Sequence, residues 1–326
     1  MFIANFELES TVRTYITQLD SLPESNLNDD VMSAVRLSGG FVNHVWRITF
    51  ISKRTIILKQ YPVTIKWDPN MKLPQQRSQV EYCALSSMQS LSNNSTLWSS
   101  PKPLFYDAEA SVVIMSDVGS DMTTLYDLLR KDHGEPPVLN FIGDAVNEFV
   151  ASVQDVAEPK APQENMTAVL DSTHDGAKAS LEKALGSEIG LKWFERSLKA
   201  RAIQKEWIFG DLWPSGVLVH PEQQRIAVVD WECCRPAHSG MDVTQMCANL
   251  FLMTMGTPFH NLQAKECLQD IVRAAKQSRA YDPTFDYAGA FVGHVAVLVA
   301  YPHWELPAGP SAAIAQAANE AESIFC

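Results

Sequence analysis

Two aspartates flank a short predicted hairpin and together could carry out phosphoryl transfer. Asp211 precedes the β-rich run 216–220, and Asp230 ends the second run, 225–230. Phosphoryl transfer needs one carboxylate that faces the acceptor hydroxyl and one that faces a metal ion, both on a rigid support. This hairpin would supply both. An isolated pair of aspartates is more often a turn residue and a strand cap, so the surrounding pattern has to decide.

The residues before the hairpin predict a small β lobe with one helix. Short β-rich runs between residues 35 and 59 are separated by a Gly-Gly pair and a polar turn, which favours adjacent antiparallel strands. Pro74 opens a predicted helix, and strands are expected at 103–106 and 111–115. We therefore predict an amino-terminal lobe over residues 1–116.

The rest of the chain predicts a larger, mainly α-helical lobe over residues 117–326. Helical patterns occur on both sides of the hairpin, and Asp242 is the expected N-cap of the helix that follows it. The predicted helices are 123–129, 138–156, 176–185, 191–204, 243–255, 261–277 and 287–300. The fold class is therefore α+β, with two lobes.

The hairpin and its flanks resemble a known family. FGDLWPSGVLV at 209–219, followed by VVDWE at 228–232, is similar to the catalytic loop and metal-binding strand of aminoglycoside/choline kinase-like phosphotransferases. IMSDVG at 114–119 looks most like the methylthioribose-kinase-like branch. The resemblance implies a bilobal protein-kinase-like fold that uses ATP and Mg²⁺ to phosphorylate a small-molecule hydroxyl.

The resemblance also implies roles for individual residues. Asp211 would be the catalytic base, Asp230 and Glu232 would hold the metal, and Asp242 would brace the catalytic loop. On the nucleotide side, a Gly-Gly turn would approach the phosphates and a strand lysine would pair with a helix glutamate. The expected nucleotide-binding residues are Gly39, Gly40, Asn43, Lys59, Glu81, Met115 and Val118.

Two positions depart from the family pattern. Gly216 stands where the family has a metal-binding asparagine or serine, and glycine offers no side-chain oxygen. Phe209 replaces a histidine that packs beneath the loop, a role that another aromatic ring could keep. Three hypotheses remain open. The chain is a working kinase, a kinase-fold enzyme redirected to isomerisation, elimination or cyclisation through Asp211 or His294, or a non-catalytic pseudokinase.

The acceptor pocket is expected near the carboxy-terminal helices. Aromatic and histidine side chains from this region and from the catalytic loop are candidate lining residues, although each taken alone is more often a core residue. They are Trp213, Trp231, His294, Tyr301, His303 and Trp304.

Composition limits the remaining function classes. The 326 residues carry a net charge of −12 and show no basic cluster, which argues against nucleic-acid binding. Six cysteines without metal-site or disulfide spacing favour a reduced protein in the cytoplasm. The most apolar stretch, 287–301, is shorter than the roughly 20 residues that span a bilayer. We expect a small-molecule substrate, no membrane partner and no nucleic-acid partner, and the sequence does not indicate an oligomeric state.

Overall fold

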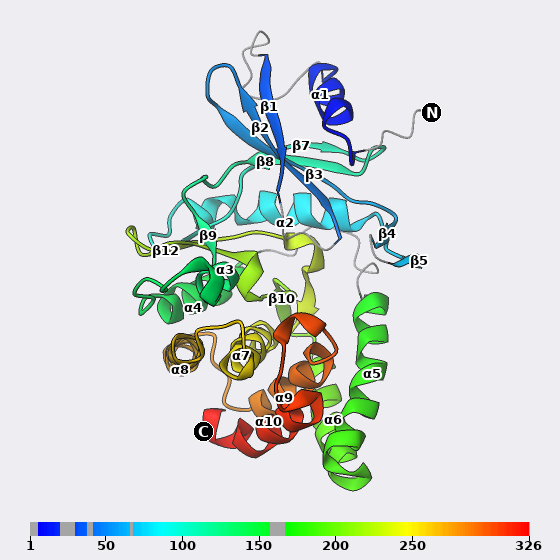
Figure 1. Ribbon diagram of the computed structural model, residues 1–326, viewed down its shortest axis with the longest axis vertical. Coiled ribbons are helices and arrows are strands. Elements are labelled where there is room, and N and C mark those ends of the chain that lie inside the picture. Colours follow the sequence, from blue (N-terminus) through cyan, green and yellow to red (C-terminus); the bar gives the residue numbers. More distant parts are fainter. Residues whose placement is uncertain (1–5, 20–29, 38–41, 66–67, 157–166, 326) are drawn as a thin grey trace.

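The computed structural model describes residues 6–19, 30–37, 42–65, 68–156 and 167–325. The predicted nucleotide-binding glycines Gly39 and Gly40 lie outside these residues. The molecule has two parts along its long axis in Figure 1: a strand-rich amino-terminal part lies above a helical carboxy-terminal part.

A five-stranded antiparallel sheet forms the amino-terminal part. Its strands are ordered β1-β2-β3-β8-β7, so β3 and β8 lie near the centre. β2 alternates buried with half-buried residues, and its apolar face packs with those of β1, β3 and β8 in a separate core cluster. The strands are β1 (Val31–Arg36), β2 (His44–Phe50), β3 (Thr55–Gln60), β7 (Pro103–Asp107) and β8 (Val112–Ser116).

Two helices accompany this sheet, where one was expected. The predicted helix is α2 (Arg77–Ser92), which crosses below the sheet in Figure 1. The additional helix, α1 (Glu9–Thr17), buries Val12 and Ile16 in the core cluster of the sheet. It has only two buried apolar residues and no side-chain cap, so the sequence carries little signal for it. A small hairpin of β4 (Thr64–Ile65) and β5 (Asp68–Lys72) precedes α2.

The predicted hairpin is confirmed and belongs to a four-stranded sheet ordered β6-β12-β11-β9. β11 (Val217–His220) and β12 (Arg225–Val228) pair antiparallel, with Val217 opposite Val228. β6 (Trp98–Ser99) pairs parallel with β12, although it precedes β7 in the chain. A segment of the predicted amino-terminal lobe thus completes the sheet that carries the hairpin, and the division at residues 116 and 117 stays a prediction.

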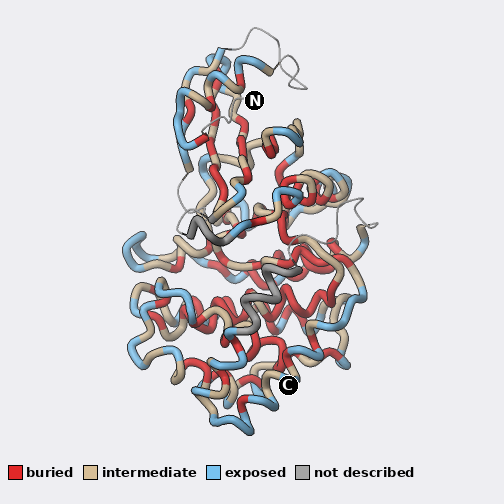
Figure 2. The backbone as a smooth tube through the Cα atoms, turned by 90° about the vertical axis from the view of Figure 1, so that its right-hand side faces the viewer, coloured by how far each residue is buried: buried red, intermediate tan, exposed pale blue. Residues whose placement is uncertain are grey.

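Helices make up most of the carboxy-terminal part and enclose the largest core cluster. Figure 2 shows buried backbone concentrated in the interior of this part and exposed backbone at its rim. No helix among the described residues is long and apolar enough to cross a membrane. The helices are α3 (Leu125–Leu128), α4 (Ile142–Val153), α5 (Thr167–Leu185), α6 (Ser187–Arg201), α7 (Gly240–Met255), α8 (Asn261–Gln277), α9 (Tyr287–Leu298) and α10 (Gly309–Phe325).

Three details differ from the sequence predictions. The segment predicted as helix 123–129 begins as strand β9 (Thr123–Thr124), and α3 adds one turn. Asp242 is not the N-cap of α7, because the helix begins at Gly240 and the aspartate lies in its first turn. α10 was not predicted, although its buried alanines and Ile314 pack against α9 and α5. A mixed α+β fold with a helical carboxy-terminal part is confirmed.

Candidate active site

A cavity of about 530 Å³ lies between the amino-terminal sheet and the β11–β12 hairpin. Strands β2, β3 and β8 contribute to one side, while α3, the loop after β10 (Glu206–Ile208) and the hairpin contribute to the other. Most of the predicted site residues line it together. These are Asn43, Lys59, Glu81, Met115, Val118, Asp211, Trp213, Asp230 and Glu232.

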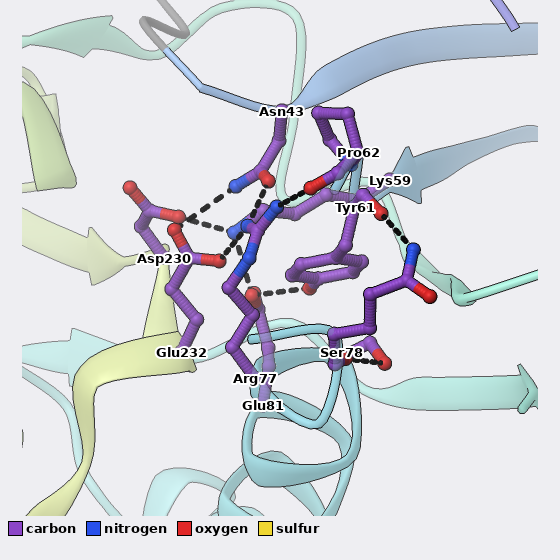
Figure 3. Close-up of polar contacts among 10 residues, drawn as sticks. Asn43, Lys59, Tyr61, Pro62, Arg77, Ser78, Glu81, Asp230 and Glu232 are labelled. Atoms are coloured by element: carbon purple, nitrogen blue, oxygen red, sulfur yellow. Dashed lines mark hydrogen bonds and ion pairs between the residues drawn. The ribbon is translucent and has the colours of Figure 1, made fainter. Parts of the chain in front are cut away.

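Lys59 connects the two sides of the cavity. β3 holds it opposite Val45 on one neighbouring strand and Val113 on the other. Its Nζ donates to Glu81 Oε2 at 2.5 Å and also to Asp230 Oδ1. Burial disfavours the ammonium, but the carboxylates of Asp230 and Glu81 outweigh this effect and raise the pKa of Lys59 above its ordinary value. Lys59 is therefore a fixed positive charge at the cavity wall. Figure 3 shows its contacts with Asp230 and Glu81.

A second ion pair lies beside the first. Arg77, at the start of α2, is fully buried, and its Nη1 donates to Glu232 Oε2 at 2.6 Å and to Asn43 Oδ1. Asn43 Nδ2 donates to the other carboxylate oxygen of Glu232 at 3.1 Å. Sequence reasoning missed Arg77, because an arginine in the first turn of a helix usually remains in solvent. Figure 3 shows how the two ion pairs stand next to each other.

Asp230 has the backbone conformation of a tight turn, with φ 78° and ψ 57°. Aspartate tolerates this left-handed region better than most residues. The carboxylate remains 37% exposed although Lys59 contacts one oxygen, so the side chain is accessible from the cavity. Oxygens of Glu81, Asp230 and Glu232 lie within 4.8 Å of one another. Carboxylate oxygens are ligands that a hard divalent cation such as Mg²⁺ prefers, and the side chain of Asp230 is the most exposed of the three.

Asp211 lies between β10 and the 3-10 turn η2 (Pro214–Gly216). Gln245 of α7 donates a 2.5 Å hydrogen bond to Asp211 Oδ1. Burial and the nearby charge of Asp230 nevertheless raise the pKa of Asp211 to about 7. A carboxylate whose pKa lies near neutrality is suited to accept a proton from a hydroxyl group.

Asp242 braces the loop that carries Asp211, which is the role the resemblance implied. Its carboxylate accepts hydrogen bonds of 2.8 Å from the backbone N–H groups of Phe209 and Gly210. Gly210 has φ +88°, and a Cβ there would lie 2.1 Å from the carbonyl oxygen of Cys233. Only glycine fits this approach.

Phe209 supports the loop from below, and Trp231 belongs to the same aromatic cluster. The two rings lie edge to face with centroids 5.0 Å apart, and both contact Phe149. Trp231 is 1% exposed and donates its indole N–H to the carbonyl of Val228. Trp231 was predicted to line the substrate pocket, but the structure places it in the core.

The predicted acceptor residues separate into two groups. Trp213 and His303 line the cavity, and Tyr301 stacks on His303 at 5.9 Å, with its pKa raised by burial and by the charge of Asp211. Trp304 is 1% exposed and its indole donates to the carbonyl of Leu298, so it is a core residue. His294 is half-buried on α9 and is not among the lining residues.

Tyr126 lines the cavity and was missed. It lies on α3 with its ring 6.4 Å from that of Trp213 and 6.1 Å from that of His303. Tyr126, Trp213 and His303 therefore form an aromatic wall, contributed by three separated segments of the chain. Only the tertiary arrangement brings these segments together, and no spacing in the sequence indicates it.

Arg47 and Asp117 were also missed. Arg47 of β2 makes a two-pronged ion pair with Asp117, at 2.6 and 3.0 Å, just after β8. This pair fixes the chain next to Met115 and Val118, where it leaves the sheet. In the sequence, Asp117 appeared only within the segment 114–119 that resembles the family.

Gly216 does not need the conformational freedom of glycine. Among the described residues, the glycines with positive φ do not include it. A Cβ at this position would meet the carbonyl oxygen of Val229 at 3.4 Å and Trp213 Cδ1 at 3.6 Å, which are ordinary contacts. The adjacent Ser215 lines the cavity. The backbone would thus admit a side chain at position 216.

Comparison with known proteins identifies the family. The model of the phosphotransferase enzyme family matches residues 33–280. The chain belongs to this family. A curated 4-hydroxytryptamine kinase of Psilocybe cubensis is 23% identical over 92% of this chain and 88% of its own length.

Solved structures show the same fold. An amicoumacin kinase, solved with AMP-PNP, Ca²⁺ and Ami, has a TM-score of 0.58 at 13% identity and covers 97% of this chain and 93% of its own. A choline/ethanolamine kinase family protein from Mesorhizobium loti has a TM-score of 0.57 at 12% identity, covering 97% and 94%. The predictions of a bilobal kinase-like fold and of a small-molecule phosphotransferase are confirmed. The methylthioribose-kinase-like branch stays a prediction.

Proposed function

We propose that this phosphotransferase transfers the γ-phosphoryl group of ATP, with Mg²⁺, to a hydroxyl group on an aromatic amine. One observation carries the proposal: Lys59 links Glu81 to Asp230 in the same cavity that Asp211 lines. Phosphoryl transfer relies on positioning and charge neutralisation, and these four residues supply a fixed cation, a metal-facing carboxylate and a base.

Each residue has a defined part in the proposed reaction. Asp211 accepts the hydroxyl proton as the acceptor oxygen bonds to the γ-phosphorus, and the bond to the β–γ bridging oxygen breaks to release ADP. Lys59 stabilises the charge on the phosphates, and Glu81 keeps it in place. Asp230 would hold the divalent cation, which supplies further neutralisation of the triphosphate.

The aromatic wall favours a flat acceptor. Tyr126, Trp213 and His303 contribute aromatic rings to the lining of the cavity, and aromatic groups pack on one another with specific gains beyond burial. Burial lowers the pKa of His303, so this wall is uncharged near neutral pH. The relative named 4-hydroxytryptamine kinase acts, by its name, on a hydroxylated aromatic amine, which supports the same class for this chain.

Charge at the acceptor end favours an amine. Among the described carboxylates of the cavity, Asp117, Glu81, Asp230 and Glu232 pair with lysine or arginine. Asp127 and Asp211 make no such pair in the described part of the chain; the imidazole of His133 lies 4.0 Å from Asp127. A protonated amine would offset this negative charge.

Incubation with ATP, Mg²⁺ and 4-hydroxytryptamine tests the proposal, with choline as a non-aromatic acceptor. We expect a phosphate monoester, identified by ³¹P NMR and mass spectrometry, formed in equal amount to ADP and faster than with choline. Conversion of the acceptor without ADP would instead favour a redirected enzyme. Nucleotide binding without turnover of any acceptor tried would favour a non-catalytic protein.

We also propose that the protein acts in the cytoplasm. The five described cysteines are thiols rather than disulfides, which suits a reducing compartment. Cys233, Cys247 and Cys267 are buried, and burial raises the pKa of each thiol, so they are core residues rather than reactive groups.

A further inference from the structure

Glu232 has both of its carboxylate oxygens occupied. Oε2 accepts from Arg77 Nη1 at 2.6 Å, and Oε1 accepts from Asn43 Nδ2 at 3.1 Å. The carboxylate is only 10% exposed. Asp230 differs, because Lys59 contacts Oδ1 and the side chain stays 37% exposed. A metal ion could therefore reach the carboxylate of Asp230 more easily than that of Glu232.

Arg77, which neutralises Glu232, also has several other partners. Its guanidinium donates to Asn43, Glu232 and the backbone carbonyl of Pro62, the last at 2.7 Å, and lies 5.0 Å from the centroid of the Tyr61 ring. Arginine keeps its charge at all physiological pH values. Figure 3 shows the guanidinium between Asn43 and Glu232, beside the Lys59 contacts. The site therefore contains a second permanent cation.

Gly216 gives independent support. It offers no side-chain oxygen to a metal, and its carbonyl oxygen accepts from the backbone N–H of Val229 at 2.9 Å. Neither φ nor crowding explains the glycine. A second divalent ion would need ligands of its own, and Mg²⁺ takes oxygen ligands in near-octahedral geometry. Position 216 provides no side-chain ligand, and Glu232 already accepts from Arg77 and Asn43.

We infer that the enzyme uses one divalent cation, held through Asp230, because the buried guanidinium of Arg77 takes the place of a second cation as the partner of Glu232. In this arrangement Glu232 is not a metal ligand, although it was predicted as one. Arg77, Asn43 and Glu232 act as positioning residues, because they join the start of α2 and the residue preceding β2 to the turn that carries Asp230. The inference rests on the proposed function, since it assumes that metal and nucleotide bind here.

Counting bound ions tests the inference without any substitution. Mn²⁺ replaces Mg²⁺, AMP-PNP replaces ATP, and the free Mn²⁺ is measured by electron paramagnetic resonance as the protein–nucleotide complex is titrated. We expect one tightly bound Mn²⁺ per complex. Two equivalent or near-equivalent ions would overturn the inference while leaving the proposed function intact. No Mn²⁺-dependent nucleotide binding would overturn the proposed function and the inference together.

Two isosteric variants separate the carboxylates. Asp230→Asn should weaken Mn²⁺ binding to the nucleotide complex at least about 100-fold, because the amide oxygen that remains carries no negative charge. Glu232→Gln should lower thermal stability, because it leaves the charge of Arg77 uncompensated. It should change Mn²⁺ binding less than about threefold, because the amide oxygen can still accept from Arg77. Circular dichroism and thermal unfolding check that both fold. A loss in folded Glu232→Gln as large as in Asp230→Asn would make Glu232 a ligand and reject the inference.

Discussion

The two ends of the cavity are built on opposite principles. At the nucleotide end each of these charged groups has an oppositely charged partner at close range: Lys59 pairs with Glu81 and Asp230, and Arg77 pairs with Glu232. At the acceptor end the wall is aromatic, and Asp211 receives a hydrogen bond from the neutral side chain of Gln245. In the proposed function, the first end binds a charged ligand and the second a flat one. The pKa of the carboxylate at the second end, Asp211, lies near neutrality.

This difference indicates which residues can be substituted without loss of phosphoryl transfer. Removing one member of a buried ion pair leaves an uncompensated charge, which typically costs about 3–5 kcal/mol of stability. Replacing one ring of the aromatic wall removes only part of a contact surface. We therefore expect substitutions at the nucleotide end to affect folding and catalysis together, and those at the acceptor end to affect selectivity or the pH profile.

The largest effect on turnover is expected at Asp211. Asp211→Asn removes the base but keeps the shape of the side chain, so kcat should fall roughly 10²- to 10⁴-fold. Nucleotide affinity, measured by calorimetry with Mg²⁺, should stay near that of the wild type because Asp211 makes no nucleotide-end ion pair in the described structure. Wild-type kcat in the variant would show that Asp211 is not the base.

The pH dependence of turnover should reveal the raised pKa of Asp211. Only the deprotonated carboxylate can accept a proton, and its pKa is raised to about 7, so kcat/KM for the acceptor should fall as the pH drops below about 7. Cation binding at Asp230 should move this limb to lower pH, because it offsets the charge that raises the pKa.

Gln245→Met should shift the acidic limb of the kcat/KM profile to higher pH. The hydrogen bond from Gln245 lowers the pKa of Asp211, so its loss raises the pKa and moves the limb upward by about one pH unit. Activity at pH 9 should change little, which separates this effect from damage to the fold. An unshifted limb would mean that Gln245 does not set the charge of Asp211.

The aromatic wall should give a smaller and selective effect. Trp213→Leu should raise KM for an aromatic acceptor about 3- to 10-fold, since an aromatic contact contributes about 0.5–1.5 kcal/mol beyond burial. Trp213→Phe keeps a ring face and serves as the matched control. KM for ATP should be unaffected in both. Equal losses for aromatic and non-aromatic acceptors would argue against a ring-stacking role.

The sequence predicted the parts of the site that follow from local order. The β11–β12 hairpin and the positions of Lys59, Asp211 and Asp230 depend on alternation, turns and a family motif, all visible in one segment at a time. Arg77 and Tyr126 could not be found in this way, because each acquires its role from partners far along the chain. Trp231 and Trp304 were assigned to the pocket because residue type does not tell a core tryptophan from a lining one.

Gly216→Asn is expected to have the smallest effect, and it sharpens the contrast between the two ends. The new side chain fits, because a Cβ would lie 3.4 Å from the carbonyl oxygen of Val229 and the position has no positive φ. An amide oxygen there would add a possible ligand without altering the acceptor wall. If one cation normally suffices, kcat should stay within about threefold of wild type while the Mg²⁺ concentration for half-maximal rate falls modestly.

A Mg²⁺ titration of ATP turnover in both proteins, at a fixed acceptor concentration, decides the outcome. A rise in kcat of more than about tenfold would mean that the natural chain lacks an ion its chemistry requires, contrary to the role assigned to Arg77. A gain in Mn²⁺ stoichiometry from one to two, without a matching gain in kcat, would show that the chain can host a second ion but does not need it. Loss of turnover with unchanged thermal stability would instead indicate that substrate occupies the space beside Gly216, which would move the acceptor site closer to the hairpin than the aromatic wall suggests.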